Sequence, residues 1–314
     1  MNTGLIIKLI PRTIVDIMHP AKKPIITRFA PSPTGPLHLG HAMAAIYAFD
    51  MAREYGTDGR FLLRMEDIDT ARTRPEFEQA IFTDLEWLGL EWETPVRRQS
   101  EHMADYASAL RQLDEMGLLY PCFCTRGEIQ AEIERSQTAP HMPTGASEGP
   151  DGPLYPGTCL KLGEDLAKEK MAAQVPYALR LNMQKALSMV ADPLMWTDTI
   201  KGEIKAAPEI FQDVVLARKD VPTSYHLAVS VDDHLQGVNM VTRGEDLFSA
   251  THVHRLIQAL LRLDVPTYSH HGLVSDNNGQ RLAKRDKATT LKTLRESGYT
   301  PTDIRNMVGL KTRG

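Results

Sequence analysis

Residues 28–41 read Arg-Phe-Ala-Pro-Ser-Pro-Thr-Gly-Pro-Leu-His-Leu-Gly-His. A strand-like apolar run over residues 25–29 enters this turn, and the turn delivers His38 and His41 into the start of a predicted helix. Residues three positions apart share one face of a helix. A helix start offers free backbone N–H groups and the positive end of the helix dipole, so this stretch favours a phosphate or another anion, whose charge two imidazoles can stabilise.

Strand and helix signals alternate after this stretch. Apolar residues at helical spacing predict a helix over residues 43–55, and Gly56 ends it. Residues 61–63 form a short buried-strand run, and a second amphipathic helix is predicted over residues 75–89. This order predicts an α/β fold with a Rossmann-like parallel sheet and right-handed crossovers.

The alternating pattern is interrupted in the middle of the chain. Residues 138–156 are dense in proline and glycine, which is typical of a long surface loop, and we therefore take residues 118–195 as an insertion that splits the sheet. The pattern then returns with three predicted strands and an amphipathic helix, at residues 214–216, 227–229, 238–241 and 250–262.

A chain of 314 residues is long enough for one large domain with an insertion. The net charge of −4 gives no overall basic field, so a nucleic-acid partner would need a local basic patch. The longest apolar runs are too short to cross a bilayer, and the N-terminal residues lack the features of a signal peptide. We expect an N-terminal extension, the first half of the core, the insertion, the second half of the core, and a loop with a short helical segment, over residues 1–22, 23–117, 118–195, 196–275 and 276–314.

The three cysteines are Cys122, Cys124 and Cys159. An odd, small number argues against a disulfide framework and fits a reducing cytoplasm. The pattern is Cys-x-Cys followed by Tyr155-x-x-x-Cys159, so three thiolates and one tyrosine oxygen could supply the four ligands of a tetrahedral zinc site. The spacing alone leaves free thiols as the alternative, and His141 could replace Tyr155 as the fourth ligand.

Two motifs carry a resemblance to a known family. The run from Arg28 to His41 resembles the HIGH signature of class I aminoacyl-tRNA synthetases, in particular their glutamyl branch. Residues 280–287 resemble the second class I signature, the mobile KMSKS loop, with Lys284 on its second lysine. In this loop Arg281 replaces the first lysine and keeps the charge, whereas an alanine replaces the serine.

The resemblance implies a reaction in which an amino acid carboxylate attacks the α-phosphorus of ATP and pyrophosphate leaves. His38, His41 and Lys284 are then the catalytic residues, which stabilise charge on the phosphates without a protein nucleophile. Gly40 and Arg281 complete the expected ATP site. Magnesium is expected to arrive with the triphosphate.

The resemblance also implies that the amino acid is L-glutamate. Arg28 and Arg243 match the arginines that contact the substrate carboxylate, and arginine is the planar two-pronged donor that such a group needs. Glu66 matches the acid that receives the α-amino group, and Tyr225, Ala30 and Ser32 complete the pocket. Taken singly, each residue could be structural; Arg243 could pair with Glu245, for example. Short members of the branch hold a structural zinc ion on this order of cysteines and tyrosine.

The part of the chain after Lys287 bears on the question of which position of which tRNA accepts the activated amino acid. The 27 residues that follow it are too few for an anticodon-binding domain, because independent folding below about 40 residues needs extra support. The resemblance to members without that domain implies glutamate activation without tRNA and transfer to queuosine in the anticodon loop of tRNA(Asp), by a monomer. The alternatives are a minimal glutamyl-tRNA synthetase that charges the 3′ end of tRNA(Glu), a nucleotidyltransferase for another carboxylic acid, and a synthetase-like binding module.

Overall fold

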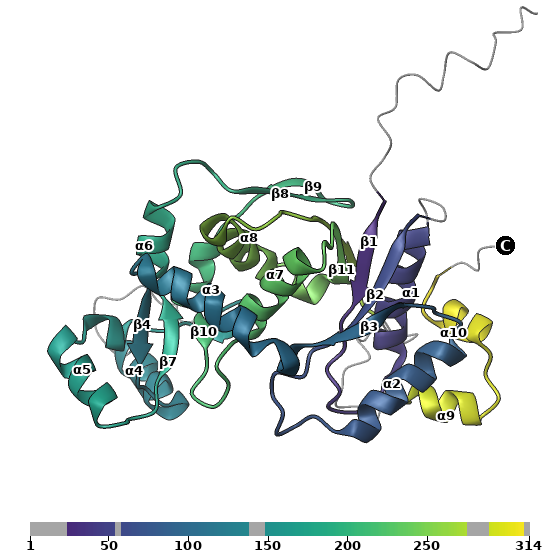
Figure 1. Cartoon of the computed structure of the whole chain (residues 1–314), viewed down its shortest axis with the longest axis horizontal. Helices are drawn as coiled ribbons and strands as arrows, with labels where there is room; N and C mark the ends of the chain where they lie inside the picture. Colours follow the sequence, from purple (N-terminus) through teal and green to yellow (C-terminus); the bar gives the residue numbers. More distant parts are fainter. Residues whose placement is uncertain (1–23, 54–57, 138–147, 275–288, 311–314) are drawn as a thin grey trace, which may run out of the picture.

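The computed structural model describes residues 24–53, 58–137, 148–274 and 289–310 (Figure 1). Two mainly parallel sheets form the centre of the molecule. The first sheet has the order β1-β2-β3, and the second has the order β11-β12-β8-β9 with only β9 antiparallel to its neighbour. Their strands are β1 (Ile26–Phe29), β2 (Arg60–Met65), β3 (Glu93–Arg98), β8 (Met195–Asp198), β9 (Gly202–Lys205), β11 (Met240–Gly244) and β12 (Thr267–His271).

The two sheets meet between β1 and β11. The side-chain oxygen of Asn239 accepts a hydrogen bond from the backbone of Ile26 at 2.9 Å, and the Asn239 N–H donates to the Ile26 carbonyl at 3.2 Å. The strand order reverses at this point, which is where open α/β sheets bind ligands. Helix α1 (Leu39–Arg53) follows β1 and contacts both β1 and β11. The expected Rossmann-like parallel sheet is confirmed.

The C-terminal helices pack on the first half of the core, although they lie far from it in sequence (Figure 1). Helix α9 (Leu291–Glu296) contacts α2 (Pro75–Trp87), and α10 (Pro301–Met307) contacts α1. The Arg305 guanidinium donates to Asp50 of α1 at 2.8 Å, and Ile304 is fully buried in the same hydrophobic cluster as Leu63. The segment after the second sheet therefore helps to hold α1 in place.

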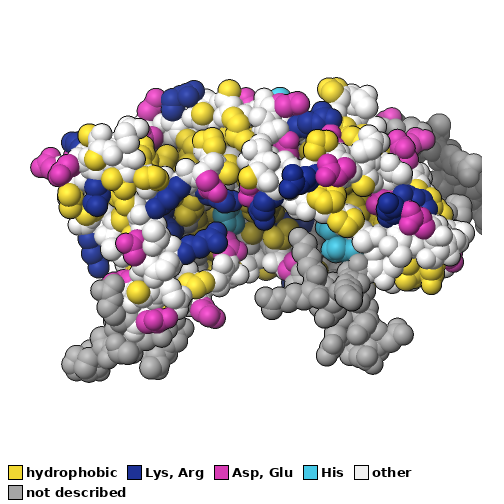
Figure 2. Space-filling view, turned by 90° about the horizontal axis from the view of Figure 1, so that it is seen from below, with side chains coloured by type: hydrophobic (Ala, Val, Ile, Leu, Met, Phe, Trp, Pro, Cys, Tyr) yellow, Lys and Arg dark blue, Asp and Glu magenta, His cyan; other side chains and the backbone are white. Residues whose placement is uncertain are grey.

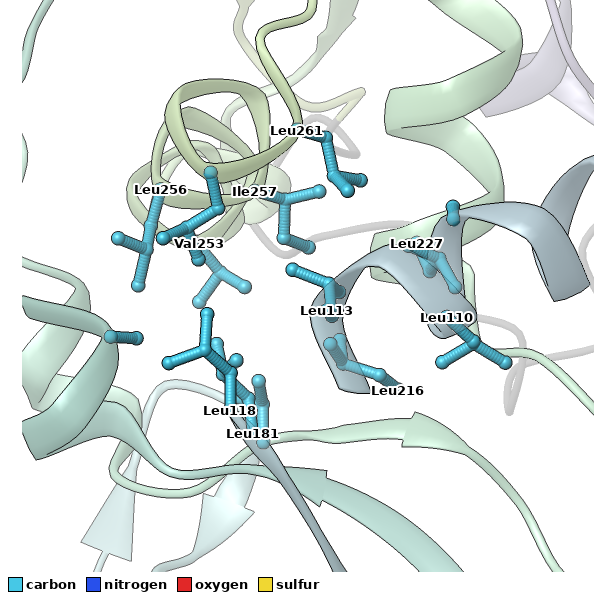
Figure 3. Packing of buried hydrophobic residues seen from close by; sticks show 14 of the residues in the cluster. Leu110, Leu113, Leu118, Leu181, Leu216, Leu227, Val253, Leu256, Ile257 and Leu261 are labelled. Atoms are coloured by element: carbon cyan, nitrogen blue, oxygen red, sulfur yellow. The ribbon is translucent and has the colours of Figure 1, made fainter. Parts of the chain in front are cut away.

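A second hydrophobic cluster lies under α8 (Ala250–Leu261), α7 (Tyr225–Leu235) and α3 (Met103–Glu115) (Figure 3). The helical repeat of α8 turns Val253 and Ile257 into this cluster, as predicted. The predicted strand at residues 227–229 was wrong, because these residues lie in α7. Three consecutive apolar residues carry no period, so a buried helix segment and a buried strand look alike at this length.

The segment around the cysteines forms its own small sheet. Strands β4 (Leu119–Cys122), β7 (Ala178–Leu181) and β10 (Val215–Ala217) pair antiparallel in the order β10-β7-β4. This sheet thus pairs β4 and β7, which belong to the predicted insertion, with β10, which follows the insertion in the sequence. Among the described residues, every helix is too short or too polar to cross a membrane. The other elements of this segment are α4 (Arg126–Gln137), β5 (Glu148–Gly149), β6 (Gly152–Pro153), α5 (Glu164–Ala172) and α6 (Met183–Ser188).

Candidate active site and metal centre

A cavity of about 1060 Å³ lies at the carboxyl ends of β1, β2 and β11. Nine of the residues selected from the sequence line it together. Lys284 and Arg281 lie outside the described residues, as does the rest of the KMSKS-like loop. The nine residues are Arg28, Ala30, Ser32, His38, Gly40, His41, Glu66, Tyr225 and Arg243.

The two histidines stand at the start of α1 with their ring centroids 3.9 Å apart. Nδ1 of His38 accepts from the Gly40 N–H at 3.1 Å, and Nδ1 of His41 accepts from the His38 N–H at 3.2 Å. A neutral imidazole that accepts at Nδ1 carries its proton on Nε2. Gly40 permits this arrangement, because a Cβ there would lie 3.0 Å from the His38 ring. Both rings are thus prepared to donate from Nε2, which suits a phosphate.

Arg28 is buried on the β1 side of the cavity and has a carboxylate partner. Its Nε donates to Asp233 of α7 at 2.9 Å, a second nitrogen reaches the other Asp233 oxygen at 3.4 Å, and a third donates to the Thr242 carbonyl at 3.1 Å. Three of its five N–H donors are therefore used by described residues. The charge of Arg28 thus has Asp233 as a carboxylate partner.

Asp233 belongs to a larger buried network. It also accepts from Arg64 of β2 at 2.8 Å, and Arg64 lies 3.7 Å from Asp232. Burial by itself would raise the pKa of Asp233, but the guanidinium groups of Arg28 and Arg64 hold it below its ordinary value. Glu66 lies at the end of this network, 3.4 Å from Arg64, and burial raises its pKa despite that neighbour. Its side chain is 15% exposed and lines the cavity.

Arg243 is equally buried on the β11 side but has different partners. Its Nε donates to Nε2 of His270 at 3.1 Å, and its terminal nitrogens donate to Nδ1 of His254 at 3.2 Å, to the Thr251 hydroxyl at 2.5 Å and to the Tyr225 hydroxyl at 3.4 Å. All four partners are uncharged groups. Arg243 makes no ion pair with any carboxylate that the structure describes, Glu245 included.

A buried guanidinium without a counter-ion is costly, and the cost is removed when an anion arrives. Among the described residues, Arg243 thus enters the cavity without an ion pair, whereas Arg28 pairs with Asp233, which it shares with Arg64. Sequence reasoning selected both arginines but missed Asp233, His254 and His270, which decide this difference. The Asp232-Asp233 doublet next to an apolar run was the signal that could have pointed to a buried acid in α7.

Figure 2 shows one face of the molecule, on which Lys and Arg side chains are interspersed with acidic and hydrophobic ones. Histidine side chains are visible near the middle of this face. Local groups of basic side chains lie on this face, between acidic and hydrophobic ones.

The three cysteines come together although they lie up to 37 residues apart in the chain. Their sulfur atoms all lie within 4.8 Å of one another, and those of Cys124 and Cys159 are 3.4 Å apart. The Tyr155 hydroxyl lies 3.7 Å from the Cys124 sulfur and accepts from the Cys159 N–H at 2.7 Å. His141 lies outside the described residues.

The cluster fits a tetrahedral metal ion. With metal–sulfur bonds of about 2.3 Å, tetrahedral geometry separates the thiolates by about 3.8 Å, close to the spacing seen here. Burial raises the pKa of the Cys124 thiol to about 12. Burial also acts to raise the pKa of Cys159, but hydrogen bonds from the Tyr155 hydroxyl and the Phe123 N–H lower it below its ordinary value. The group can therefore bind a metal ion through Cys122, Cys124 and Cys159, with Tyr155 as the neighbouring oxygen.

The fold and the cavity define the catalytic domain of a class I tRNA synthetase. Residues 24–313 match the family model described as "tRNA synthetases class I (E and Q), catalytic domain". The chain therefore belongs to this family.

Individual relatives show which members of this family the chain resembles. The chain is 49% identical to the glutamyl-Q tRNA(Asp) synthetase of Rhodobacter capsulatus, over 91% of this chain and 100% of that protein. It is 34% identical to the glutamate–tRNA ligase of Coprothermobacter proteolyticus, over 91% of this chain but 58% of that protein. The crystal structure of the glutamate–tRNA synthetase from Elizabethkingia anophelis matches with a TM-score of 0.73 and 28% identity, over 90% of this chain and 61% of that chain.

Proposed function

We propose that this protein activates L-glutamate with ATP, without tRNA, and transfers the glutamyl group to queuosine in the anticodon loop of tRNA(Asp). The observation that carries the proposal is Arg243, a buried guanidinium without a carboxylate partner among the described residues, in a cavity that also contains the two histidines at the start of α1. The cavity thus offers a cation for an acid side chain beside donors for phosphate.

In the first step, an oxygen of the α-carboxylate of glutamate attacks the α-phosphorus of ATP. The new P–O bond gives glutamyl-adenylate, and the bond to pyrophosphate breaks. His38 and His41 donate from Nε2 to the phosphates, and Lys284 of the KMSKS-like loop adds a positive charge. The chain positions the reactants and stabilises charge; it supplies no nucleophile.

The pocket residues have distinct roles in substrate selection. Arg243 and Arg28 bind the side-chain carboxylate, Tyr225 borders it, and Glu66 receives the α-amino group. Ala30 and Ser32 line the cavity beside them. Glutamine would leave the Arg243 charge without a counter-ion, so it is rejected more strongly than a simple loss of contact area would allow.

In the second step, a hydroxyl oxygen of the queuosine ring attacks the activated carbonyl carbon. An ester forms, AMP leaves with the bonding electrons, and the hydroxyl proton is released. The choice of queuosine over the 3′ end of tRNA(Glu) is supported by the higher identity to a glutamyl-Q tRNA(Asp) synthetase, 49%, than to a glutamate–tRNA ligase, 34%.

Two metal ions accompany this function. Mg²⁺ enters as the ATP complex. Zinc on Cys122, Cys124, Cys159 and Tyr155 is structural and fixes the segment between β4 and β7. We place the protein in the cytoplasm, where its tRNA substrate is found, and propose that it acts as a monomer.

The test has two stages. Glutamate-dependent ATP–pyrophosphate exchange without tRNA tests activation; exchange with another acid but not with glutamate would contradict the pocket assignment. Transfer of labelled glutamate to purified tRNA(Asp), with and without queuosine, then tests the acceptor. If label appears on tRNA(Glu) instead, and blocking the 3′ end of that tRNA prevents the labelling, the result would favour the minimal glutamyl-tRNA synthetase.

A further inference from the structure

Behind Arg243 lies a second layer of polar groups that the proposed function does not use. The first branch runs through His270 of β12. Nδ1 of His270 donates to Asp198 of β8 at 2.7 Å, and both side chains are fully buried. Because its proton is held on Nδ1 by the carboxylate, Nε2 of His270 is an acceptor, and this atom receives the Arg243 Nε–H at 3.1 Å.

The second branch runs through two histidines on α8 and α7. Nδ1 of His254 accepts from Arg243, so the proton of this ring lies on Nε2, which is 3.1 Å from Nδ1 of His226. Nε2 of His226 in turn lies 3.0 Å from Asp151, in the turn of the β5–β6 hairpin. Every proton in this chain of hydrogen bonds points away from Arg243, toward a carboxylate.

The two branches share one design. Each places a carboxylate one or two rings away from the guanidinium instead of in contact with it. Burial lowers the pKa of His270 to about 4 and that of His254 well below its ordinary value, with Arg243 acting in the same direction, so both rings are neutral near pH 7. Neutral acceptors fix the orientation of Arg243 but leave its charge for a ligand.

We propose that Nε2 of His270 and Nδ1 of His254 position the Arg243 guanidinium for the side-chain carboxylate of the substrate, and that Asp198 and His226 set the tautomers in which these two rings can accept. His270, His254, Asp198 and His226 are positioning residues that act through Arg243 and touch neither ATP nor the reacting atoms. The inference rests on the proposed function, in which Arg243 binds that carboxylate.

The experiment measures KM for glutamate and KM for ATP in ATP–pyrophosphate exchange. His270→Leu and His254→Leu remove an acceptor from a charged donor, and each should raise KM for glutamate about tenfold or more while KM for ATP stays constant. His270→Gln can present an oxygen near the place of Nε2, and His254→Asn near that of Nδ1, so both should recover most of the loss.

Asp198→Asn tests the tautomer directly. The amide is nearly the size of the carboxylate but can donate to Nδ1 of His270, which moves the ring proton to Nε2 and points it at Arg243. We expect this variant to raise KM for glutamate as much as His270→Leu does. An Asp198→Asn variant with the glutamate KM of the wild type would overturn the tautomer part of the inference.

The chain offers a matched control on the same helix. His234 of α7 lies 3.0 Å from Asp264, as His226 lies 3.0 Å from Asp151, but in the described part of the chain His234 makes no hydrogen bond to His254 or Arg243. His226→Leu should raise KM for glutamate, whereas His234→Leu should leave it unchanged. Equal effects of the two variants would mean that α7 acts only through general stability.

A measurement on the wild type keeps the inference testable if a variant does not fold. Nitrogen-15 NMR of labelled histidines should show the Nδ1–H tautomer for His270 and the Nε2–H tautomer for His254, and the opposite tautomers would overturn it. Absence of glutamate-dependent exchange in the wild type would instead refute the proposed function. Normal exchange with unchanged glutamate KM in both leucine variants would refute the positioning role alone.

Discussion

Arg28 and Arg243 enter the same cavity from neighbouring strands, yet only Arg28 faces a carboxylate of its own chain among the residues described. On the β1 side, Asp233 balances the charge and ties Arg28 into a buried network that continues through Arg64. On the β11 side, imidazole and hydroxyl groups hold Arg243 and leave its charge unbalanced. Removing the partner of a paired buried charge leaves that charge uncompensated, whereas a buried arginine without a carboxylate partner already bears this cost.

The largest effect is expected from Arg243→Ala. We expect kcat/KM for glutamate to fall by about 100- to 1000-fold, because the substrate carboxylate loses its unbalanced partner. The melting temperature should fall less than in Arg28→Ala, since a buried charge without a counter-ion is removed together with its hydrogen bonds. Exchange kinetics and calorimetry check both statements. Arg243→Lys is the control that keeps the charge and loses the planar fork. A melting temperature that falls as far in Arg243→Ala as in Arg28→Ala would contradict the contrast between the two arginines.

The next effect is on stability and comes from Arg28→Ala. We expect the free energy of unfolding to fall by about 3 kcal/mol, because Asp233 keeps its buried charge but loses one of its partners. Urea unfolding measures this loss. Arg60→Ala is the matched control at the start of β2: its pair with Glu93 is 2.6 Å long but about half exposed, so the change should stay below about 1 kcal/mol. Equal losses of unfolding free energy in Arg28→Ala and Arg60→Ala would mean that the buried pair is no more important for stability than the exposed one.

Acid should lower the free energy of unfolding through His270, which contacts Arg243. Its pKa lies near 4 when folded against an ordinary 6.5, so between these values the unfolded chain binds a proton that the folded chain does not. The contribution of this group to the free energy of unfolding is therefore fully present above pH 6.5, falls by about 3 kcal/mol as the pH drops to 4, and levels off below that. Unfolding across this range measures the slope. His270→Gln should reduce this slope, to which His254 also contributes, and an unchanged slope in that variant would assign it to other groups.

The smallest effect on glutamate use is expected from loss of the metal centre. Cys122→Ser should lower zinc content, measured by mass spectrometry, together with the melting temperature. Asp151 lies in the β5–β6 hairpin, which directly precedes Tyr155 in the chain. Loss of the metal should therefore disturb the contact of Asp151 with His226 and raise KM for glutamate by about threefold or less. Wild-type protein that contains no zinc and has unchanged stability after chelation would end the zinc assignment.

Much of the fold could be predicted because its signals are local. The place of the HLGH run at the start of α1, the helical spacing of α1, α2 and α8, and the strands β1, β2 and β11 each depend on a few adjacent residues, and the structure confirms them. The strand predicted at residues 214–216 is also present as β10, but it pairs with β7 in the antiparallel sheet instead of the parallel core. The failure at residues 227–229 has the same origin, since a short apolar run fits a buried helix as well as a strand. The KMSKS-like loop stays a prediction, because its residues lie outside those described.

The sequence by itself determined the class of protein, because the residues of each motif lie close together in the chain. Only the tertiary structure decided which of the two arginines pairs with a described carboxylate. Asp233 lies 205 residues from Arg28, and His270 lies 72 residues from Asp198. No local pattern records such pairings, because they arise when α7 and β12 pack beside the two strands that carry the arginines.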